Sequence, residues 1–272
     1  MPLASTIARI YIFHWRYTPN YRGKFFLAKF LDRLFTSFKA NTAYGVKLNI
    51  FLSSSMDMSY CEAIATNPHH HIVELLNQLE PGDLFCDIGA NIGFFSLIAA
   101  QRLGKEGLVI CFEPSAREFT RLVQNLDDNH VENVVFFNTA LSDQVGVARF
   151  LTAKTHTGLN FLGDGADSDE FDSCLIPTVP GDLLLEPLFA QRTGKAIVKI
   201  DVEGAEYQVI SGMEQFLANP RVHTVVVEVT PKFLARFGHT REQLYTKMAS
   251  LGFQPTVEST AWQYDQIFVR QC

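Results

Sequence analysis

Five short apolar segments alternate with stretches of helical periodicity between residues 83 and 229. The apolar segments are 83–88, 108–113, 134–139, 196–203 and 224–229. The helical patterns lie near 93–103, 116–129 and 206–217. Strands that are joined through helices of this length form βαβ units, which build a parallel sheet with helices on both faces. The sequence therefore predicts a doubly wound α/β fold.

Two other segments predict departures from a purely parallel sheet. A helix expected near 240–251 is followed by "FQPTVE" and "WQYDQIFVR", which predict two antiparallel strands joined by a short turn. Residues 142–195 include the Gly-, Asp- and Ser-rich stretch "THTGLNFLGDGADSDEFDS", which predicts a long exposed loop. Because this loop follows the third strand, we expect it above the carboxyl edge of the sheet, where long loops are often functional.

Composition and charge narrow the class of protein. The 272 residues are 47% hydrophobic and 19% charged, which indicates one large globular domain with a small extension. The net charge of −6 is uneven, because residues 1–50 carry +7 and residues 51–272 carry −13. An acidic main body disfavours nucleic-acid binding, which needs a basic face. No apolar run reaches the length of a membrane span and no clear signal-peptide core is present, so we expect a cytoplasmic protein.

Residues 1–45 predict a basic, aromatic and helical N-terminal arm ahead of a main domain at 46–272. Within the arm, Phe26, Phe30, Leu34 and Phe38 recur at helical spacing and form an apolar stripe. The favoured interpretation is a helix that packs on the domain or over its site. Peripheral contact with a membrane is an alternative, because the arm combines an apolar stripe with Lys and Arg. A homodimer interface is a third.

The stretch "DLFCDIGANIGFFSLIAA" (83–100) is the strongest local signal for a ligand site. Asp87 ends a strand, Gly89 opens a tight turn and Gly93 begins a helix. Glycine at these places permits a positive φ and a close approach of the backbone to a ligand. The dinucleotide fingerprint G-x-G-x-x-G needs a middle glycine that is absent here. The pattern instead suits a ligand with an amino-acid moiety, whose positive groups Asp87 can help to hold.

The next two strand ends extend this site. Glu113, in "FEP", ends the second strand, where its carboxylate can accept hydrogen bonds from a ribose diol. Thr139 and Ala140, in "NTALSD", end the third strand and predict the wall beside an adenine. Each residue alone has an ordinary structural explanation. Their order along three strand ends indicates S-adenosylmethionine (SAM) as the cofactor.

Charges interrupt the fourth strand, "AIVKIDVEGAEY" (196–207), where Lys199, Asp201 and Glu203 occupy every second position. Side chains alternate faces along a strand, so these three should share one face. Lys199 and Asp201 predict a compensated pair, because a lone buried charge is costly. Ligands of doubly wound sheets bind outside the carboxyl ends of the strands, which places Asp201 and Glu203 beside the cofactor.

SAM donates methyl groups, and where the acceptor is a hydroxyl, a base that takes the hydroxyl proton assists the transfer. Glu203 is the first candidate, Asp201 the second and His156 the third, with Glu228 and His239 at the same edge. The alternative is that Asp201 and Glu203 only organise the turn and hold Lys199. Asp201, Glu203 and Glu228 could together hold Mg²⁺, but a metal-free site is favoured.

A run of three histidines, residues 69–71, opens a helix expected over 69–79, with Asn67 as its cap and Pro68 in its first turn. Neighbouring residues on a helix point in different directions. The run is therefore interpreted as a solvated helix start and not as a metal site.

With these motifs in place, the chain resembles the FkbM family of SAM-dependent methyltransferases. The resemblance covers about residues 80–230 and rests on "DIGANIG", "FEP", "NTALSD", "KIDVEGAE" and "VVVEV". It implies a class I (Rossmann-like) methyltransferase fold with strand order 3-2-1-4-5-7-6 and an antiparallel seventh strand. It also implies that SAM is held at Asp87, Gly89, Ala90, Asn91, Gly93, Glu113 and Pro114, together with Thr139, Ala140 and Asp201.

The function that the resemblance implies is O-methylation of a sugar, a glycan or another hydroxylated natural product, as in polysaccharide or secondary-metabolite biosynthesis. An N-methyltransferase of a small molecule is one alternative. A non-catalytic protein that docks on a glycan or a membrane is the other. A nucleotide-dependent oxidoreductase is disfavoured by the missing glycine. The partners expected are a small-molecule or glycan acceptor, and no nucleic acid.

Overall fold

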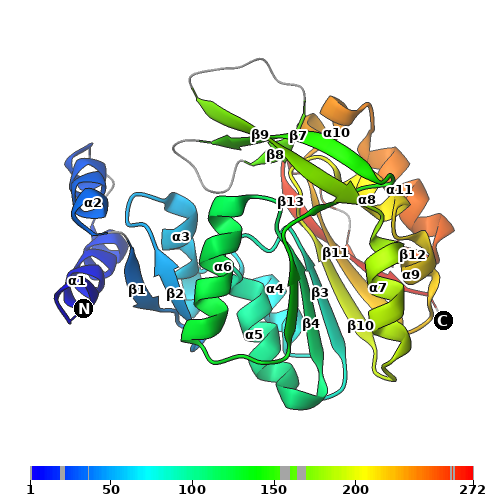
Figure 1. The fold of residues 1–272 in the computed structure, drawn as a ribbon, viewed down its shortest axis with the longest axis horizontal. Coiled ribbons are helices and arrows are strands. Elements are labelled where there is room, and N and C mark those ends of the chain that lie inside the picture. The colour runs from blue at the N-terminus through cyan, green and yellow to red at the C-terminus, as the bar shows by residue number, and fades with distance from the viewer. Residues whose placement is uncertain are drawn as a thin grey trace.

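A computed structural model describes residues 2–18, 22–35, 37–153, 160–163, 170–257, 259 and 261–271. A seven-stranded sheet with the order β12-β13-β11-β10-β3-β4-β5 forms its centre (Figure 1). Its strands are β3 (Leu84–Ile88), β4 (Leu108–Phe112), β5 (Val134–Phe137), β10 (Ala196–Ile200), β11 (Val222–Val229), β12 (Phe253–Pro255) and β13 (Tyr264–Arg270).

The strand directions follow the expected variant of the doubly wound plan. The pairs from β11 through β10 and β3 to β5 are parallel, and β13 pairs antiparallel with both β11 and β12. Numbered along the chain within this sheet, the order from β5 to β12 is 3-2-1-4-5-7-6, with the seventh strand reversed. The strand order therefore reverses between β3 and β10, where such sheets bind ligands.

Helices cover both faces of the sheet, because successive strand residues point to opposite sides. Ile197 of β10 packs in one apolar cluster and Val198 in the other. The first face carries α4 (His70–Leu76), α5 (Phe94–Leu103) and α6 (Ala116–Asp128), and the second carries α7 (Gly181–Ala190), α8 (Glu206–Ser211), α9 (Glu214–Ala218) and α11 (Arg241–Ser250). The predicted α/β fold is confirmed.

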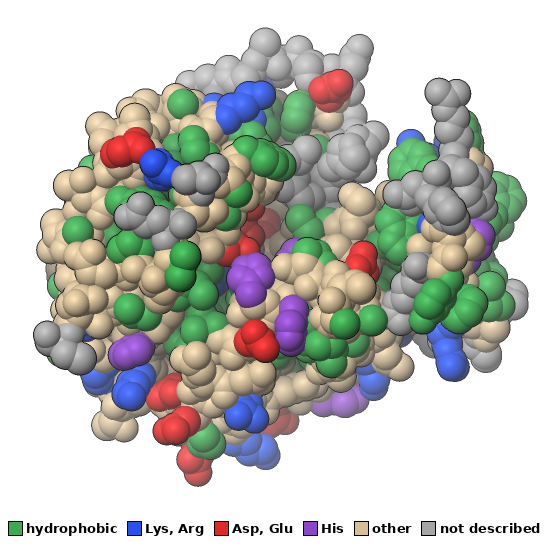
Figure 2. All heavy atoms as spheres, turned by 180° about the vertical axis from the view of Figure 1, so that it is seen from behind, with side chains coloured by type: hydrophobic (Ala, Val, Ile, Leu, Met, Phe, Trp, Pro, Cys, Tyr) green, Lys and Arg blue, Asp and Glu red, His purple; other side chains and the backbone are tan. Residues whose placement is uncertain are grey.

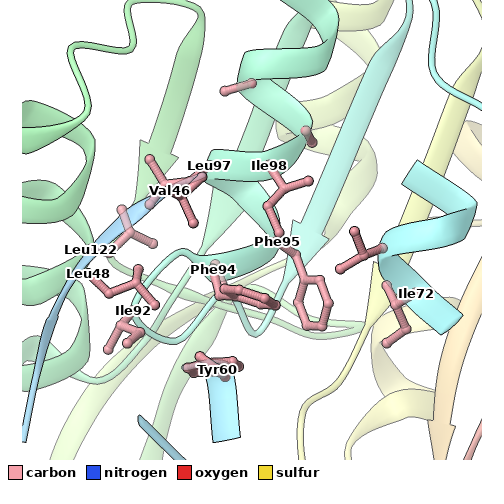
Figure 3. Close-up of a cluster of buried hydrophobic side chains, with 14 of the residues drawn as sticks. Val46, Leu48, Tyr60, Ile72, Ile92, Phe94, Phe95, Leu97, Ile98 and Leu122 are labelled. Carbon is pink, nitrogen blue, oxygen red and sulfur yellow. The ribbon is translucent and has the colours of Figure 1, made fainter. Parts of the chain in front are cut away.

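Shorter elements complete the domain. They are α3 (Ser55–Tyr60), α10 (Pro231–Leu234) and the 3₁₀ turns Ile64–Thr66, Gly104–Glu106 and Ala235–Phe237. Figure 3 shows how α3 and α4 join the first core, with Tyr60 below the ring of Phe94 and Ile72 beside Phe95. The rings of Tyr60 and Phe94 stack with their centroids 4.6 Å apart.

Several predicted boundaries were wrong. The fourth strand ends at Ile200 and not at Glu203, and the helix expected over 206–217 is two helices. It breaks at Gly212, where a Cβ would lie 1.9 Å from the carbonyl oxygen of Ser142. The short turn expected between the last two strands is the longer segment 256–263. The helix expected over 69–79 spans His70–Leu76, with His69 and not Asn67 at its N-cap.

The described residues of the range 142–195 form strands and a helix where a loop was expected. A second sheet with the order β6-β9-β7-β8 lies above the carboxyl edge of the central sheet (Figure 1). Its strands are β6 (Ala140–Leu141), β7 (Gly146–Ala153), β8 (Phe161–Leu162) and β9 (Phe171–Val179). One small cluster of buried side chains in it is formed by Ala140, Phe150 and Ile176, and most described residues of β9 are exposed or half-buried. Strands with so few buried side chains carry little hydrophobic alternation, which explains why the sequence pattern did not reveal them.

The N-terminal region differs from the predicted arm in its extent. It consists of α1 (Pro2–Tyr17), α2 (Arg22–Leu34) and a hairpin of β1 (Phe38–Asn41) and β2 (Lys47–Ile50). The hairpin belongs to the domain, because the Asn49 backbone N–H and side-chain amide both donate to Asn125 Oδ1 of α6. The predicted boundary at residue 45 therefore falls inside this hairpin, and Phe38 lies in a strand and not in the expected helical stripe. No helix of the described segments is long and apolar enough to cross a membrane.

Candidate active site

A cavity of about 1040 Å³ opens at the carboxyl edge of the central sheet. Residues at the carboxyl ends of β3, β4, β5, β10 and β11 line one part of it. The rest is lined by α3, the start of α4, the second sheet and described residues between Thr256 and Ile267. Figure 2 shows acidic side chains inside a hollow on this face, with histidine side chains at its rim. The cavity therefore occupies the place where the strand order reverses.

The loop after β3 approaches β10 so closely that only glycine fits at its first turn. Gly89 has φ 81°, and a Cβ there would lie 1.8 Å from the carbonyl oxygen of Asp201. The N–H groups of Gly89 and Ala90 both donate to the carbonyl oxygen of Phe112 at 3.0 Å. The loop is therefore fixed to both neighbouring strands. Its next residue, Asn91, has φ 52° and lines the cavity.

Glu113 ties the loop after β3 to the end of β4. Its carboxylate accepts the N–H of Asn91 and the N–H of Ser115, each at 2.8 Å. Burial raises the pKa of Glu113 to about 8. The side-chain amide of Asn138 donates to the carbonyl oxygens of Glu113 and Pro114. The ends of the first three parallel strands thus form one hydrogen-bonded rim.

Most of the predicted cofactor residues lie on this rim, and two do not. Those that line the cavity are Gly89, Ala90, Asn91, Glu113, Pro114, Thr139, Ala140 and Asp201. Asp87 is fully buried behind the wall, where Ser96 Oγ donates to its Oδ2 at 2.6 Å. Gly93 is the N-cap of α5 and has φ 84°. In this structure Asp87 and Gly93 therefore position the wall and are not part of the cavity surface.

Lys199 is a buried cation at the base of the site. Its Nζ lies 2.9 Å from Asp201 Oδ2 and 3.9 Å from Asp87 Oδ1, over the ring of Phe95 at 5.2 Å from the centroid. Burial lowers the pKa of Lys199, but the two carboxylates outweigh this effect and hold the pKa above its usual value. The predicted pair of Lys199 and Asp201 is present, and Asp87 adds a second carboxylate to it.

Three carboxylates meet above Lys199. One oxygen each of Asp201, Glu203 and Glu228 lies within 4.8 Å of the others. Gln263 Nε2 donates to Glu228 Oε1 at 2.6 Å. The Oε2 atoms of Glu203 and Glu228 are buried and have no hydrogen-bond partner among the described residues. Such a group stabilises bound protons or cations, because the carboxylates repel one another when all are charged.

The pKa values of two members of this group reflect that repulsion. Burial, with the charges of Asp201 and Glu206, raises the pKa of Glu203 to about 9. Burial and the charges of Asp201 and Glu203 raise the pKa of Glu228 well above its usual value. Glu203 therefore holds a proton at neutral pH in the ligand-free protein, and the pKa of Glu228 is shifted in the same direction.

Glu203 has a backbone conformation that is unusual for glutamate, with φ 56°. The turn around it is held by Glu206, whose Oε1 accepts the N–H of Gly204 at 2.9 Å and that of Val202 at 3.3 Å. At Gly204 a Cβ would lie 2.7 Å from the carbonyl oxygen of Phe233. Glu206 thus has a structural role in this turn, and Glu203 lines the cavity.

The histidines are arranged differently from the prediction. His69 and His71, expected to be solvated, both line the cavity. His69 Nε2 lies 3.0 Å from Ser59 Oγ, and burial lowers the pKa of His69 to about 4. His71 Nε2 lies 2.8 Å from Asp265 Oδ2, and this hydrogen bond raises the pKa of His71. The helix α4 begins after His69, later than expected, and its first turn faces the cavity. Residue spacing alone does not reveal where the helix begins.

The remaining candidate bases are not on the cavity surface that the structure describes. His239 stacks on Tyr207, with ring centroids 3.9 Å apart, and is not a lining residue. His156 lies outside the described residues. Trp262 and Tyr264, by contrast, line the cavity and were not predicted. They lie at the start of "WQYDQIFVR", which the sequence predicted as a strand and not as part of a site.

A comparison with known protein families agrees with the structure of the site. The model of the methyltransferase FkbM domain matches residues 87–255, which is more than half of the chain. The chain belongs to the FkbM methyltransferase family. The matched range begins at the end of β3 and includes Glu113, Asp201, Glu203 and Glu228. The resemblance inferred from the sequence motifs is confirmed.

Two curated relatives are similar to this chain over part of their length. The hexuronic acid methyltransferase AglP of Haloferax volcanii is 32% identical over 155 residues, which cover 57% of this chain and 59% of AglP. The 31-O-demethyl-FK506 methyltransferase FkbM of Streptomyces tacrolimicus is 32% identical over 178 residues, which cover 56% of this chain and 67% of that relative. The chain thus spans less than two thirds of AglP.

Solved structures show more distant likeness. The methyltransferase FkbM from Methylobacillus flagellatus KT aligns with a TM-score of 0.45 at 12% identity, covering 71% of this chain and 44% of that one. TYW2 of M. jannaschii in complex with AdoMet aligns with a TM-score of 0.44 at 14% identity, covering 87% of each chain.

Proposed function

We propose that this FkbM-family protein is an O-methyltransferase that moves a methyl group from SAM to a hydroxyl of a sugar, a glycan or another hydroxylated natural product. One observation carries the proposal. A single cavity at the reversal of strand order joins the loop of Gly89 and Asn91, the Glu113 rim and the carboxylates Asp201, Glu203 and Glu228. The relatives AglP and FkbM are methyltransferases, which supports methyl transfer.

The described residues of the cavity offer hydrogen-bonding groups that suit SAM. Glu113 has lone pairs left for a ribose diol beyond its two backbone hydrogen bonds. Thr139 and Ala140 stand on the same wall at the end of β5. The side-chain oxygens of Asp201 and Glu203 line the same cavity and can accept hydrogen bonds from the ammonium group of SAM. Asp87 would support this indirectly, by holding Lys199 and α5 in place.

SAM, when bound, supplies a methyl group on positively charged sulfur, and the acceptor oxygen takes that group as its own proton leaves. The work of the chain is therefore to position the acceptor and to receive the proton. Glu203 is the proposed base, with Asp201 second and His156 third. Glu203 must be ionised to act, and a nearby cation lowers the pKa of a carboxyl. Binding of the cationic cofactor would thus help to prepare Glu203.

The acceptor side of the cavity suits a hydroxyl-rich molecule. The carboxylates of Glu203, Glu228 and Asp265 line it and can accept hydrogen bonds from several hydroxyls. The ring of Trp262 offers an apolar surface beside them. This combination of acceptors and an aromatic ring supports a sugar or another polyol over an apolar acceptor.

Three alternatives lead to different outcomes in experiments. An N-methyltransferase would use the same cofactor half with an amine acceptor. A non-catalytic docking protein would bind glycan or membrane without methylating anything. A Mg²⁺-dependent enzyme would use Asp201, Glu203 and Glu228 as oxygen ligands. We do not favour the metal, because Lys199 already neutralises Asp201.

The test is to incubate the purified chain with isotopically labelled SAM and with fractionated glycans and metabolites, and to identify the methylated product by mass spectrometry. Label on an oxygen of a sugar or polyol is the expected result. Label on nitrogen would select the N-methyltransferase. Absence of S-adenosylhomocysteine binding in calorimetry, together with absence of label, would reject the enzyme proposal.

A further inference from the structure

The α1–α2 hairpin exposes a set of large apolar side chains on its outer surface. Phe13 is 66% exposed, Phe26 is 74% exposed and Leu34 is 60% exposed. In Figure 2 the hairpin lies at the right, set apart from the rest of the molecule, with apolar side chains gathered over it. We call this set the arm face: Ile10, Phe13, Tyr17, Phe26, Phe30 and Leu34.

Hydrogen bonds on the inner side of the hairpin hold its two helices together, so the residues of the arm face have fixed positions. Tyr11 is buried, and its hydroxyl donates to the carbonyl oxygen of Lys24 at 2.9 Å. The buried ammonium of Lys24 donates to the carbonyl oxygens of Trp15 and Thr18 at 2.9 and 3.0 Å. These bonds satisfy carbonyls at the end of α1 and fix α2 against it. The favoured expectation, that the apolar stripe packs on the domain, was therefore wrong for Phe26 and Leu34.

The charges around the arm face are of one sign. Arg9, Lys29 and Arg33 are exposed on the two helices. Asp32 is the sole acid of residues 1–50, and its carboxylate accepts the N–H groups of Leu52 and Ser53 at 2.9 and 2.8 Å. Asp32 is thus turned toward the domain. The outer surface of the hairpin presents cations and apolar groups together.

We propose that the arm face docks on the surface of an anionic lipid membrane. Phe13, Phe26 and Phe30 would enter the boundary between headgroups and acyl chains, and Lys29 and Arg33 would contact lipid phosphates. A helix with an apolar face and flanking Lys or Arg lies in that boundary. Residues 51–272 carry −13, so the same lipids repel the main domain and leave only the hairpin in contact.

Contact of the arm face with a second copy of the chain is less favoured than contact with a membrane. Two arm faces in contact would bring the cations of both copies together, which opposes association. Anionic phosphates instead complement Arg9, Lys29 and Arg33. The α1 and α2 helices contain 16 and 13 residues, which suits helices that lie along a surface.

The test is flotation of the full chain with vesicles of phosphatidylcholine alone and with vesicles of equal parts phosphatidylcholine and phosphatidylglycerol. We expect binding to the anionic vesicles at least about tenfold stronger than to the neutral ones. Phe26→Ser with Phe30→Ser should weaken this binding about tenfold or more, and so should Lys29→Glu with Arg33→Glu. Circular dichroism checks that each variant is folded. If the variant with Phe26→Ser and Phe30→Ser does not fold, the variant with Lys29→Glu and Arg33→Glu tests the proposal alone.

Matched controls lie elsewhere on the surface. Leu175→Ser changes a 74% exposed leucine of β9, and Lys105→Glu reverses an exposed cation outside the hairpin. Both should bind vesicles like the unchanged chain. Wild-type protein that ignores both vesicles would overturn the proposal, as would arm variants that bind as well as the controls. A dimer in analytical ultracentrifugation that dissociates in the serine pair would assign the arm face to a second copy. None of these measurements uses SAM, so the result is independent of the proposed activity.

Discussion

The Nζ of Lys199 on β10 lies 3.9 Å from Oδ1 of Asp87 on the neighbouring strand β3, and both side chains are buried. The ion pair crosses the point where the strand order reverses. It therefore connects the strand that leads into the cofactor loop with the strand that leads to the carboxylates. Folding and the geometry of the site depend on the same buried charge.

Replacement of Lys199 by methionine tests this dependence. The change leaves Asp87 buried without its cation, and removal of one partner of a buried pair costs about 3–5 kcal/mol. We expect the free energy of unfolding in urea to fall by about that amount. Addition of Asp87→Asn to the variant should restore part of the loss. Lys105→Met, on the surface, is the matched control; an equal loss there would contradict the explanation.

Glu113→Ala should weaken the binding of S-adenosylhomocysteine about a hundredfold or more, because buried hydrogen-bond partners of the ligand are lost. The variant also leaves the N–H groups of Asn91 and Ser115 without their acceptor. Asp87→Ala should abolish binding as well, through displacement of Lys199 and α5. Isothermal titration calorimetry measures both. Glu132→Ala, an exposed acid, is the control, and unchanged affinity in Glu113→Ala would remove Glu113 from the cofactor site.

Glu203→Gln should keep the affinity for S-adenosylhomocysteine and lower turnover about a hundredfold or more, since loss of a general base costs about that much. Turnover is followed with labelled SAM once an acceptor is known. Glu228→Gln provides the comparison within the same cluster. A smaller loss in Glu228→Gln would identify Glu203 as the base, whereas full activity in Glu203→Gln would return Glu203 to a structural role.

Stability should depend on pH through the buried carboxyls. The pKa values of Glu206, Glu113 and Glu203 are raised to about 7, about 8 and about 9. Each carboxyl keeps its proton in the folded chain after the unfolded chain has lost it near pH 4.3. This stabilisation is complete below that pH and is lost as the pH rises through the folded pKa. We expect the melting temperature of the ligand-free protein to fall between about pH 5 and about pH 9. A smaller slope is expected in Glu203→Gln, and a melting temperature that rises over this range would contradict the assignment.

Chelation tests the metal alternative. We expect EDTA to leave methyl transfer unchanged and Mg²⁺ to leave the melting temperature unchanged, because Lys199 already occupies Asp201 at 2.9 Å. Calorimetric titration with Mg²⁺ is an additional measurement that needs no acceptor. Turnover that is lost in EDTA and restored by Mg²⁺ would instead make Asp201, Glu203 and Glu228 metal ligands.

The parts of the site that the sequence predicted are those encoded by local spacing. Gly89 and Glu113 follow their strands directly, so the position of a strand end sets the position of the residue. Lys199 and Asp201 are two residues apart, which brings their side chains together even though the strand ends at Ile200. In each case the local sequence sets the position of the residue, even where its contact reaches another loop, as that of Glu113 with Asn91 does.

The unpredicted parts depend on contacts between distant segments. His71 meets Asp265, which is 194 residues away, and no local pattern records that distance. The strands β7 and β9 are separated by a connection that the structure describes only in part, and they bury few side chains. The exposure of Phe26 depends on the packing of α2 against α1, which helical spacing alone does not specify.

The backbone at Glu203 has a consequence for laboratory evolution. A left-handed φ costs a glutamate roughly 1 kcal/mol or more, and glycine would adopt it freely. Selection for heat resistance alone should therefore favour Glu203→Gly, while selection for catalysis should retain the acid. If variants are selected for heat resistance without an assay for methyl transfer, we expect Glu203 to be replaced early. Such variants would be more stable and would lack the proposed base.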